Sequence, residues 1–287
     1  MTASLNKVPG GLHVERLIEL AIDEDFGHGD ITTEALGMEE IPGRAVIVSK
    51  EPMVVAGLDM VRRVYEKFGS GIFFRPLVQD GHRVQPEARV AEIKGNMGAL
   101  LSGERIALNF LQRLSGIATN VRAYVDSIPD LRVRITDTRK TIPGWRVLEK
   151  YAVRAGGAYN HRMGLFDGVL IKDNHIAACG GITQAIEKIR ASVSHLIKIE
   201  VETENLEQVK EALTTGVDVI MLDNMSRDDI EQAVKIIDGR ALVEVSGGID
   251  LERLRHLCSA GVDIISSGAL THAARTVDLS MYIEPVS

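Results

Sequence analysis

A cluster of cationic side chains between residues 132 and 162 is the first sign of chemistry in this chain. The segment holds eight Lys or Arg against two acids, whereas the 287 residues together carry a net charge of −7, so the rest sums to −13. Four of its side chains flank glycines and predicted strand ends, where binding sites are usually built: Arg139, Lys140, His161 and Arg162. Arginine forks match carboxylates, and lysine serves as a point charge on phosphate. The pattern predicts a site for a polyanionic substrate.

Three further cations in this segment have a different spacing. Arg146, Lys150 and Arg154 follow Pro143 and Gly144 at intervals of four residues. Such spacing places them on one side of a helix. We expect that side to be a solvated helix face.

Small residues after two late strands predict a phosphate site. Ser246-Gly247-Gly248 and Ser267-Gly268 each follow an apolar run and precede a helical window. Glycine allows the backbone to approach an anion closely, and the N–H groups at a helix start carry partial positive charge. Two such segments in successive units predict a phosphate cradle formed by Ser246, Gly247, Gly248 and Gly268.

Two acids and one lysine also stand at predicted strand ends. Glu202 and Asp223 follow consecutive strands, and two carboxylates beside a phosphate site suit Mg²⁺ or a ribose. The alternative is that these acids balance nearby lysines. Lys172 ends the run 168–172 and could act as a Schiff-base nucleophile, although its cationic neighbours favour neutralising an anionic substrate.

The elements that carry these residues alternate between strand and helix after residue 130. Apolar runs at 133–136, 169–172, 196–201, 217–222, 241–245 and 262–266 predict six strands. Helical windows lie between them at 206–215, 227–237 and 251–260. This alternation of strands and helices is typical of an α/β barrel, in which active-site residues lie at the carboxyl ends of the strands. Six strands rather than eight predict an incomplete barrel.

The first 115 residues have another organisation. An amphipathic helix at 12–22 precedes short β-branched runs at 45–49, 53–56, 71–77 and 89–93, which predict an antiparallel sheet with helices. A long helix is expected from about residue 98 to 125, with Leu108, Leu111 and Leu114 in its buried stripe and Arg105 on another side.

Composition excludes several classes of protein. The chain has no apolar run of the roughly 18 residues that a membrane span needs, and no basic-then-apolar signal pattern at its start. We therefore expect a cytoplasmic protein without a membrane partner. An acidic chain with 4% aromatic residues lacks the basic face and stacking platforms of a nucleic-acid-binding protein.

The motifs together resemble those of one enzyme family. The segment TRKTIPGWRVLEKYAVRAGGAYNHRMGLFDGVLIKDNHI, with LSGERIALNFLQRLSGIAT and GHGDITT before it and EVE, MLDN, EVSGGI and SSGALTH after it, closely resembles quinolinate phosphoribosyltransferase, also called carboxylating nicotinate-nucleotide pyrophosphorylase. The likeness covers essentially the whole chain. Ile142, Trp145 and Ala155 depart from the family's usual residues, but none of these departures removes a charged group.

The resemblance implies an α/β protein with an N-terminal open α/β sandwich domain (1–115, joined by the tail 273–287) and an incomplete α/β barrel domain (116–272). It implies a homodimer whose active site lies between the barrel of one subunit and the N-terminal domain of the other. Members convert quinolinate and 5-phosphoribosyl-1-pyrophosphate, with Mg²⁺, into nicotinate mononucleotide, pyrophosphate and carbon dioxide in NAD biosynthesis.

The same resemblance implies a role for each candidate residue. The quinolinate carboxylates would be held by Arg139, His161, Arg162 and Lys172. Lys140 would face the phosphoribosyl pyrophosphate, and Glu202 and Asp223 the ribose and the magnesium pyrophosphate. Phosphate would be bound by Ser246, Gly247, Gly248 and Gly268. Arg105 would reach into the partner's site.

Three other functions remain compatible with the sequence. One is that of the superfamily members found with molybdate transport, against which the intact Arg139, His161 and Arg162 argue. Another is a Schiff-base lyase that uses Lys172. The third is a non-catalytic metabolite sensor, which the retention of every candidate catalytic charge disfavours.

Overall fold

The computed structural model describes residues 8–39, 41–128 and 132–286, which form two compact units. The first unit comprises the chain up to Arg122, Ile142–Gly157 and the residues from Ala273 onward. The second comprises Ala123–Thr141 and Ala158–His272. The chain therefore passes from the first unit into the second and back more than once.

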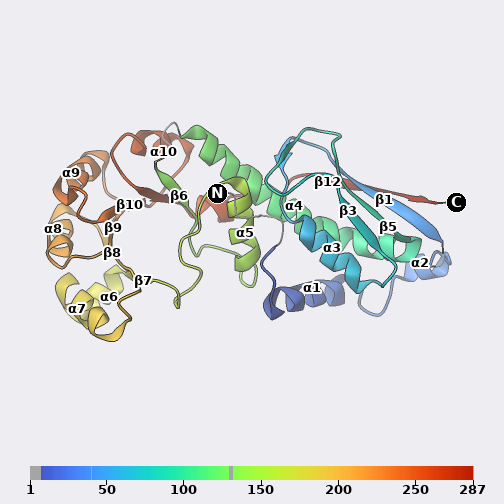
Figure 1. Ribbon diagram of the computed structural model, residues 1–287, viewed down its shortest axis with the longest axis horizontal. Coiled ribbons are helices and arrows are strands. Elements are labelled where there is room, and N and C mark those ends of the chain that lie inside the picture. Colours follow the sequence, from blue (N-terminus) through green and yellow to red (C-terminus); the bar gives the residue numbers. More distant parts are fainter. Residues whose placement is uncertain (1–7, 40, 129–131, 287) are drawn as a thin grey trace. The chain divides into compact units, whose positions relative to one another are not determined.

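The first unit is built on an antiparallel sheet of four strands in the order β12-β1-β5-β3 (Figure 1). The strands are β1 (Pro42–Ser49), β3 (Phe73–Pro76), β5 (Arg89–Asn96) and β12 (Leu279–Pro285), and a small pair joins β2 (Met53–Val54) to β4 (Arg83–Val84). The runs at 45–49, 71–77 and 89–93 form the predicted antiparallel sheet, whereas the run at 53–56 contributes β2 to the separate pair. The C-terminal strand β12 pairs with β1 along its whole length, from Gly43 opposite Pro285 to Ser49 opposite Leu279.

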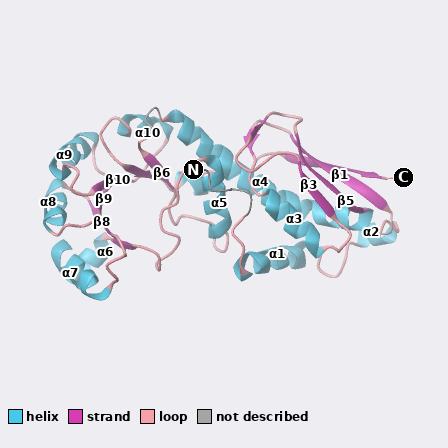
Figure 2. Cartoon of the chain, viewed as in Figure 1, coloured by secondary structure: helices cyan, strands magenta, loops and turns pink. Residues whose placement is uncertain are grey.

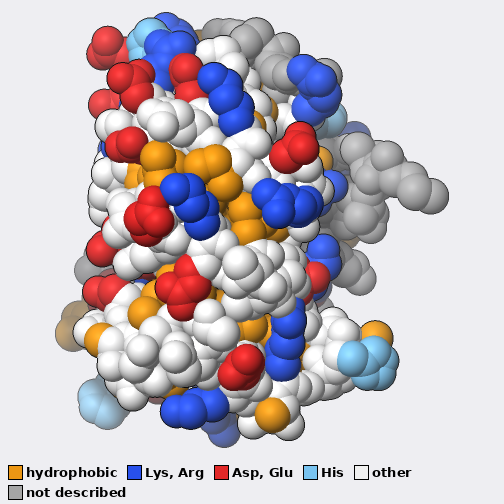
Figure 3. Space-filling view, turned by 90° about the vertical axis from the view of Figure 1, so that its left-hand side faces the viewer, with side chains coloured by type: hydrophobic (Ala, Val, Ile, Leu, Met, Phe, Trp, Pro, Cys, Tyr) orange, Lys and Arg blue, Asp and Glu red, His pale blue; other side chains and the backbone are white. Residues whose placement is uncertain are grey.

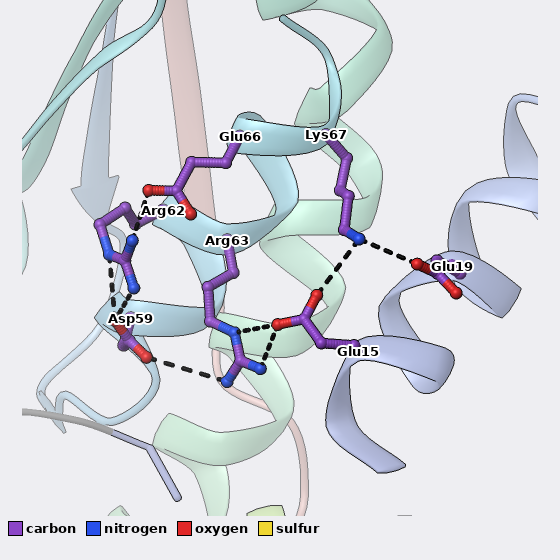
Figure 4. Close-up of polar contacts among 7 residues, drawn as sticks. All are labelled: Glu15, Glu19, Asp59, Arg62, Arg63, Glu66 and Lys67. Carbon is purple, nitrogen blue, oxygen red and sulfur yellow. Dashed lines mark hydrogen bonds and ion pairs between the residues drawn. The ribbon is translucent and has the colours of Figure 1, made fainter. Parts of the chain in front are cut away.

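Two helices of this unit are tied by an ionic network (Figure 4). They are α1 (Leu12–Asp25) and α3 (Leu58–Lys67), and the short α2 (Ile31–Ala35) follows α1. The guanidinium of Arg63, with a side chain only 9% exposed, contacts Glu15 at 2.5 Å, and Lys67 contacts both Glu15 at 3.2 Å and Glu19 at 2.9 Å. A shared carboxylate with a nearly buried arginine fixes more geometry than an exposed pair does. The network therefore fixes the register of α1 against α3.

The helices α4 (Met97–Ser127) and α5 (Arg146–Gly156) supply much of the unit's core. On α4, Leu108, Leu111 and Leu114 are buried as expected, and Arg105 is exposed. The expectation of a solvated face on α5 is wrong for one residue, because Lys150 is 1% exposed. The helix buries most of its circumference, including a fully buried Glu149 that pairs with Arg113 of α4 at 2.8 Å.

The second unit is an open α/β barrel with a parallel sheet in the order β6-β11-β10-β9-β8-β7. Its strands are β6 (Arg134–Thr136), β7 (Val169–Ile171), β8 (Ile199–Thr203), β9 (Val219–Asp223), β10 (Leu242–Ser246) and β11 (Ile264–Ser266). All six predicted strands are confirmed. Within the described residues, β6 and β7 are edge strands, so the barrel is incomplete, as predicted.

Helices cover the outside of this sheet (Figure 2). They are α6 (Asp173–Cys179), α7 (Ile182–Ser192), α8 (Leu206–Thr214), α9 (Arg227–Ile237), α10 (Leu251–Leu257) and α11 (Ala269–His272). Alternate strand residues such as Val201, Ile220 and Val245 are fully buried, whereas their neighbours include acids and serines. Side chains alternate between the two faces of a strand, so one face packs on helices and the other carries polar groups into the barrel.

The surface of the molecule is mixed in charge. Figure 3 shows Lys and Arg side chains interspersed with Asp and Glu over the displayed face. Among the described residues, no helix has the length and apolar character that crossing a bilayer requires.

Candidate functional site

The predicted site residues of the second unit follow the carboxyl ends of its strands. In a parallel barrel these ends lie at one edge, and the loops that leave them converge there. Arg139 and Lys140 follow β6, Lys172 follows β7, Glu202 lies in β8, Asp223 ends β9, Ser246 ends β10 and Gly268 follows β11. His161 and Arg162 come from the loop before β7. In the same loop, Tyr159 forms a parallel β-bridge with Thr136 of β6.

Two guanidinium groups lie close together in this site. The pKa of Arg162 is lowered from its ordinary value, first by burial and then by the positive charge of Arg139. Arg162 is held in place by a hydrogen bond from its Nη1 to the carbonyl oxygen of Gly168, at 2.9 Å. Arg139 is exposed and Arg162 is half-buried, and the acids Glu200 and Asp167 act on the pKa of Arg162 in the opposite direction. Two neighbouring guanidinium groups of this kind suit a carboxylate or phosphate ligand.

A buried aspartate fixes the loop that carries His161. Asp137, which is fully buried, accepts hydrogen bonds from the side-chain amide of Asn160 at 2.7 Å and from the backbone N–H of His161 at 2.9 Å. The imidazole is held as well, since its Nε2 lies 3.0 Å from Oε2 of Glu200 and its Nδ1 accepts from the N–H of Arg162 at 2.8 Å. The loop backbone and the ring are thus fixed independently.

Lys172 and Glu202 form an ion pair. The lysine Nζ lies 2.5 Å from Oε2 of Glu202, whose side chain is 10% exposed while that of Lys172 is 45% exposed. The sequence left open the alternative that Glu202 balances the charge of a nearby lysine. This contact is of that kind. A Schiff-base nucleophile must be a neutral amine, whereas a neighbouring carboxylate favours the charged form of an amine. The arrangement favours anion binding by Lys172.

Glu202 and Asp223 lie on the same face of neighbouring strands. Glu202 pairs with Met221, and Asp223 is two residues further along β9, opposite Ser246 of β10. Positions two apart on a strand share a face, so both acids point into the barrel near its carboxyl end. Their oxygens are the donor type that Mg²⁺ prefers. This donor set therefore fits the expected magnesium.

The predicted phosphate cradle has a backbone that only glycine tolerates well. Gly247 and Gly248 adopt φ angles of 93° and 57°, and a Cβ on Gly247 would lie 2.1 Å from Oδ1 of Asn224. The Nη1 of Arg253 donates to the carbonyl oxygen of Gly247 at 2.7 Å. The loop is thereby held with its backbone exposed to a ligand, as an anion cradle requires.

Lys140 lies over the second glycine segment. A Cβ on Gly268 would be 2.6 Å from Cδ of Lys140, so the lysine stem occupies the space that a side chain would take. The backbone of Lys140 is fixed there too, because the hydroxyl of Thr271 donates to its carbonyl oxygen at 2.7 Å. The structure thus brings Lys140 and Gly268 together, as a shared phosphate site requires.

Arg105 belongs to the first unit, not to the barrel. It lies on α4 with a side chain that is 59% exposed, and Oε1 of the adjacent Glu104 is 4.0 Å from its Nη2. An exposed arginine is available to a ligand or to another subunit. Its predicted role in a partner's site remains a prediction.

Sequence reasoning missed three buried acids. Asp137 follows the predicted strand at 133–136, and Glu200 and Glu244 lie inside the predicted strands at 196–201 and 241–245, so their sequence positions alone assign them no role. Their side chains lie inside the barrel, where the carboxylate oxygens of Glu200 and Glu244 and the Nε2 of His161 fall within 4.8 Å of one another. One signal was available in the sequence, since an acid alternating with valine or isoleucine in a buried strand must face the barrel interior.

Comparison with known proteins identifies the family of this chain. The family models for the N-terminal and C-terminal domains of quinolinate phosphoribosyl transferase match residues 30–115 and 117–282. A probable nicotinate-nucleotide pyrophosphorylase [carboxylating] from Synechocystis is 45% identical over 284 residues, covering 98% of this chain and 96% of that protein. A probable enzyme of the same name from Bacillus subtilis is 44% identical over 270 residues, covering 94% and 93%.

Solved structures give the same result. The crystal structure of NadC from Streptococcus pyogenes is 41% identical and superposes with a TM-score of 0.94, covering 98% of this chain and all of that one. The nicotinate-nucleotide pyrophosphorylase from Francisella tularensis superposes with a TM-score of 0.92 at 41% identity, over 99% of this chain and 100% of the other. With both domain models matched in order and relatives of this similarity along nearly the whole length, the chain belongs to the quinolinate phosphoribosyltransferase family.

Proposed function

We propose that this protein transfers the phosphoribosyl group of 5-phosphoribosyl-1-pyrophosphate to quinolinate with loss of carbon dioxide, giving nicotinate mononucleotide and pyrophosphate in NAD biosynthesis. The observation that carries the proposal is the placement of two consecutive residues. Arg139 lies close enough to Arg162 for its positive charge to lower the pKa of that guanidinium, and Lys140 lies over Gly268 of the proposed phosphate cradle. A dicarboxylate site and a phosphate site therefore share one loop, as a reaction between these two substrates requires.

The acids of the site suit the bond that breaks. Cleavage between ribose C1 and pyrophosphate leaves positive charge on the sugar and adds negative charge to the leaving group. Glu202 and Asp223 would stabilise the sugar cation, and Lys140 would stabilise the pyrophosphate. The same two acids would hold Mg²⁺, which neutralises charge on the pyrophosphate when it is bound.

The carboxylates of quinolinate would be held by the cations Arg139, Arg162 and Lys172, while the ring of His161, whose two nitrogens contact Glu200 and the backbone of Arg162, would line the same site. The ring nitrogen of quinolinate attacks C1 of the ribose, which makes the ring cationic. The positive charge of the ring stabilises the electron pair left on the ring carbon when the adjacent carboxylate leaves as carbon dioxide, and a proton then binds that carbon to complete nicotinate mononucleotide. Arg162 is half-buried, and a site that strips water from that carboxylate would favour its loss.

The protein is proposed to act as a homodimer with a shared site. Arg105 supports this proposal because it is exposed on α4 in the first unit, while the other candidate residues belong to the second. In the homodimer, Arg105 would contact the substrate bound by the partner's barrel. An arginine from the first unit would thereby complete the positive lining of the site.

One assay tests the proposed reaction. The protein is incubated with quinolinate, phosphoribosyl pyrophosphate and Mg²⁺, and nicotinate mononucleotide, pyrophosphate and carbon dioxide are each measured. We expect the three products in equal amounts. Replacement of quinolinate by nicotinate is the matched control, since it removes only the 2-carboxylate. Equal rates with both pyridines, or product without carbon dioxide, would refute the proposal.

A further inference from the structure

A pair of buried acids beneath His161 has no role in the proposed reaction. Glu200 on β8 is 7% exposed and Glu244 on β10 is 2% exposed. Both face the imidazole, with Nε2 lying 3.0 Å from Oε2 of Glu200 and 3.5 Å from Oε1 of Glu244. The acids thus lie on the inner side of a residue proposed to line the quinolinate site.

Their hydrogen bonding is incomplete within the described residues. Oε1 of Glu200 and Oε1 of Glu244 are buried and make no hydrogen bond there, and neither does the hydroxyl of Ser266 on β11. Two carboxylates left charged in such a place would be costly. The groups facing Glu244 are Glu200, His161 and Ser266, and its pKa is raised to about 8 by burial and then by the charge of Glu200. Burial and the neighbouring carboxylate thus favour the protonated form of Glu244, which can donate a hydrogen bond.

The ring nitrogens of His161 have distinct partners. Nδ1 accepts from the backbone N–H of Arg162, which requires that nitrogen to carry no proton. The proton of the imidazole is then on Nε2, directed at Glu200. The backbone N–H of Arg162 is held by Nδ1 of His161. The orientation of the imidazole ring therefore also affects the position of Arg162.

We propose that Glu244 is a positioning residue for the quinolinate pocket, holding the Glu200–His161 pair so that the imidazole keeps its proton on Nε2 and supports Arg162. The inference rests on the proposed function for the identity of the ligand. As an uncharged acid, Glu244 supplies a hydrogen-bond donor without adding a negative charge below a dianionic substrate. A bound metal ion is the competing explanation for three ligand atoms so close together, and it would require Glu244 to be ionised.

Two variants separate these possibilities. Glu244→Gln keeps an uncharged donor and acceptor of the same shape, whereas Glu244→Leu removes both. We expect the Leu variant to bind quinolinate about tenfold more weakly, the cost of losing an orienting hydrogen bond, with the KM for phosphoribosyl pyrophosphate unchanged. The Gln variant should match the wild type at neutral pH. Above pH 8, affinity for quinolinate should fall in the wild type but not in the Gln variant.

The measurements keep this inference distinct from the proposed reaction. Quinolinate binding is measured by calorimetry without the second substrate, so it does not depend on turnover. Nitrogen NMR of ¹⁵N-histidine-labelled protein, with His161→Gln to assign the signal, reports the tautomer without any substrate. We expect an unprotonated Nδ1 in the wild type and the Gln variant, and a changed spectrum in the Leu variant.

Four results would overturn the inference. They are unchanged quinolinate binding in the Leu variant, a Gln variant as weak as the Leu variant, a protonated Nδ1 in the wild type, or a stoichiometric metal whose removal shifts the His161 signal. If instead the tautomer and its dependence on Glu244 are found but quinolinate does not bind, the proposed function fails and the positioning of His161 stands.

Discussion

Replacing Glu244 by Gln should make the protein more stable at neutral pH. The pKa of this acid is raised from 4.5 to about 8 in the folded chain. Below pH 4.5 the carboxyl group is protonated in both the folded and the unfolded chain, and it then makes its full contribution to the free energy of unfolding. That contribution is lost as the pH rises to about 8. At neutral pH the unfolded chain releases the proton while the folded chain retains it. Folding therefore carries a penalty that an uncharged amide avoids.

The magnitude follows from the shift. Each pKa unit corresponds to about 1.4 kcal/mol, so the penalty at pH 7 is about 3 kcal/mol and reaches roughly 5 kcal/mol above pH 8. An imperfect fit of the amide would cost about 1 kcal/mol. We therefore expect the Gln variant to be more stable by about 2 kcal/mol at pH 7. The difference in the free energy of unfolding between the Gln variant and the wild type should grow by about 1.4 kcal/mol per pH unit between pH 5 and 8.

The assay is urea unfolding across this pH range at fixed ionic strength. Protein concentration must be held constant, because an oligomer is stabilised by mass action. Glu187→Gln, on the exposed side of α7, removes the same charge without a buried environment and should show no such slope. A Glu244→Gln variant that is less stable than the wild type at pH 7, or a pH-independent difference, would refute the idea that Glu244 is buried as an acid.

Three further predictions concern the site. Arg162→Ala should weaken quinolinate use by roughly 3–5 kcal/mol without creating a good nicotinate enzyme, as measured by kcat/KM for both pyridines; comparable rates with nicotinate would contradict the assignment. Gly268→Ala should displace the stem of Lys140 and raise the KM for phosphoribosyl pyrophosphate about tenfold with quinolinate binding intact, whereas Gly71→Ala, at which a Cβ meets nothing within 4 Å, should be silent. Mixing inactive Arg105→Ala and Lys140→Ala subunits should restore part of the activity, because one mixed site carries neither lesion; mixed dimers as inactive as their parents would exclude a shared site.

The barrel was predictable because its strands are short apolar runs bounded by chemistry-bearing residues. The pattern of Val, Ile and Leu indicates the six strands, and the segments that follow them include Lys140, Lys172 and Gly268. Local periodicity also gave the buried stripe of α4. These features depend on residues that are close in sequence, so they can be predicted from local sequence patterns.

The remainder depends on contacts between distant segments. Glu200 of β8 and Glu244 of β10 both lie next to His161 of the loop before β7. Their proximity depends on how these three segments are arranged around the interior of the barrel, which no local sequence pattern specifies. Lys150 shows the same limit, since its helical spacing is that of a solvated face and its burial is decided by the packing of α5. Asp137 is a strand-end acid by sequence, and only the fold shows that it holds the backbone of His161.

The pairing of β12 with β1 has a consequence during synthesis. The two strands lie roughly 230 residues apart, so on a ribosome adding 5–20 residues per second β1 waits on the order of 10–50 s for its partner. During that time one edge of the nascent sheet is unpaired, and an open edge invites pairing with another chain. Arg44 of β1 and Lys50, which directly follows β1, lie next to this edge, where positive charge discourages such contacts. Deletion of the last strand should therefore reveal itself first as aggregation of newly made chains.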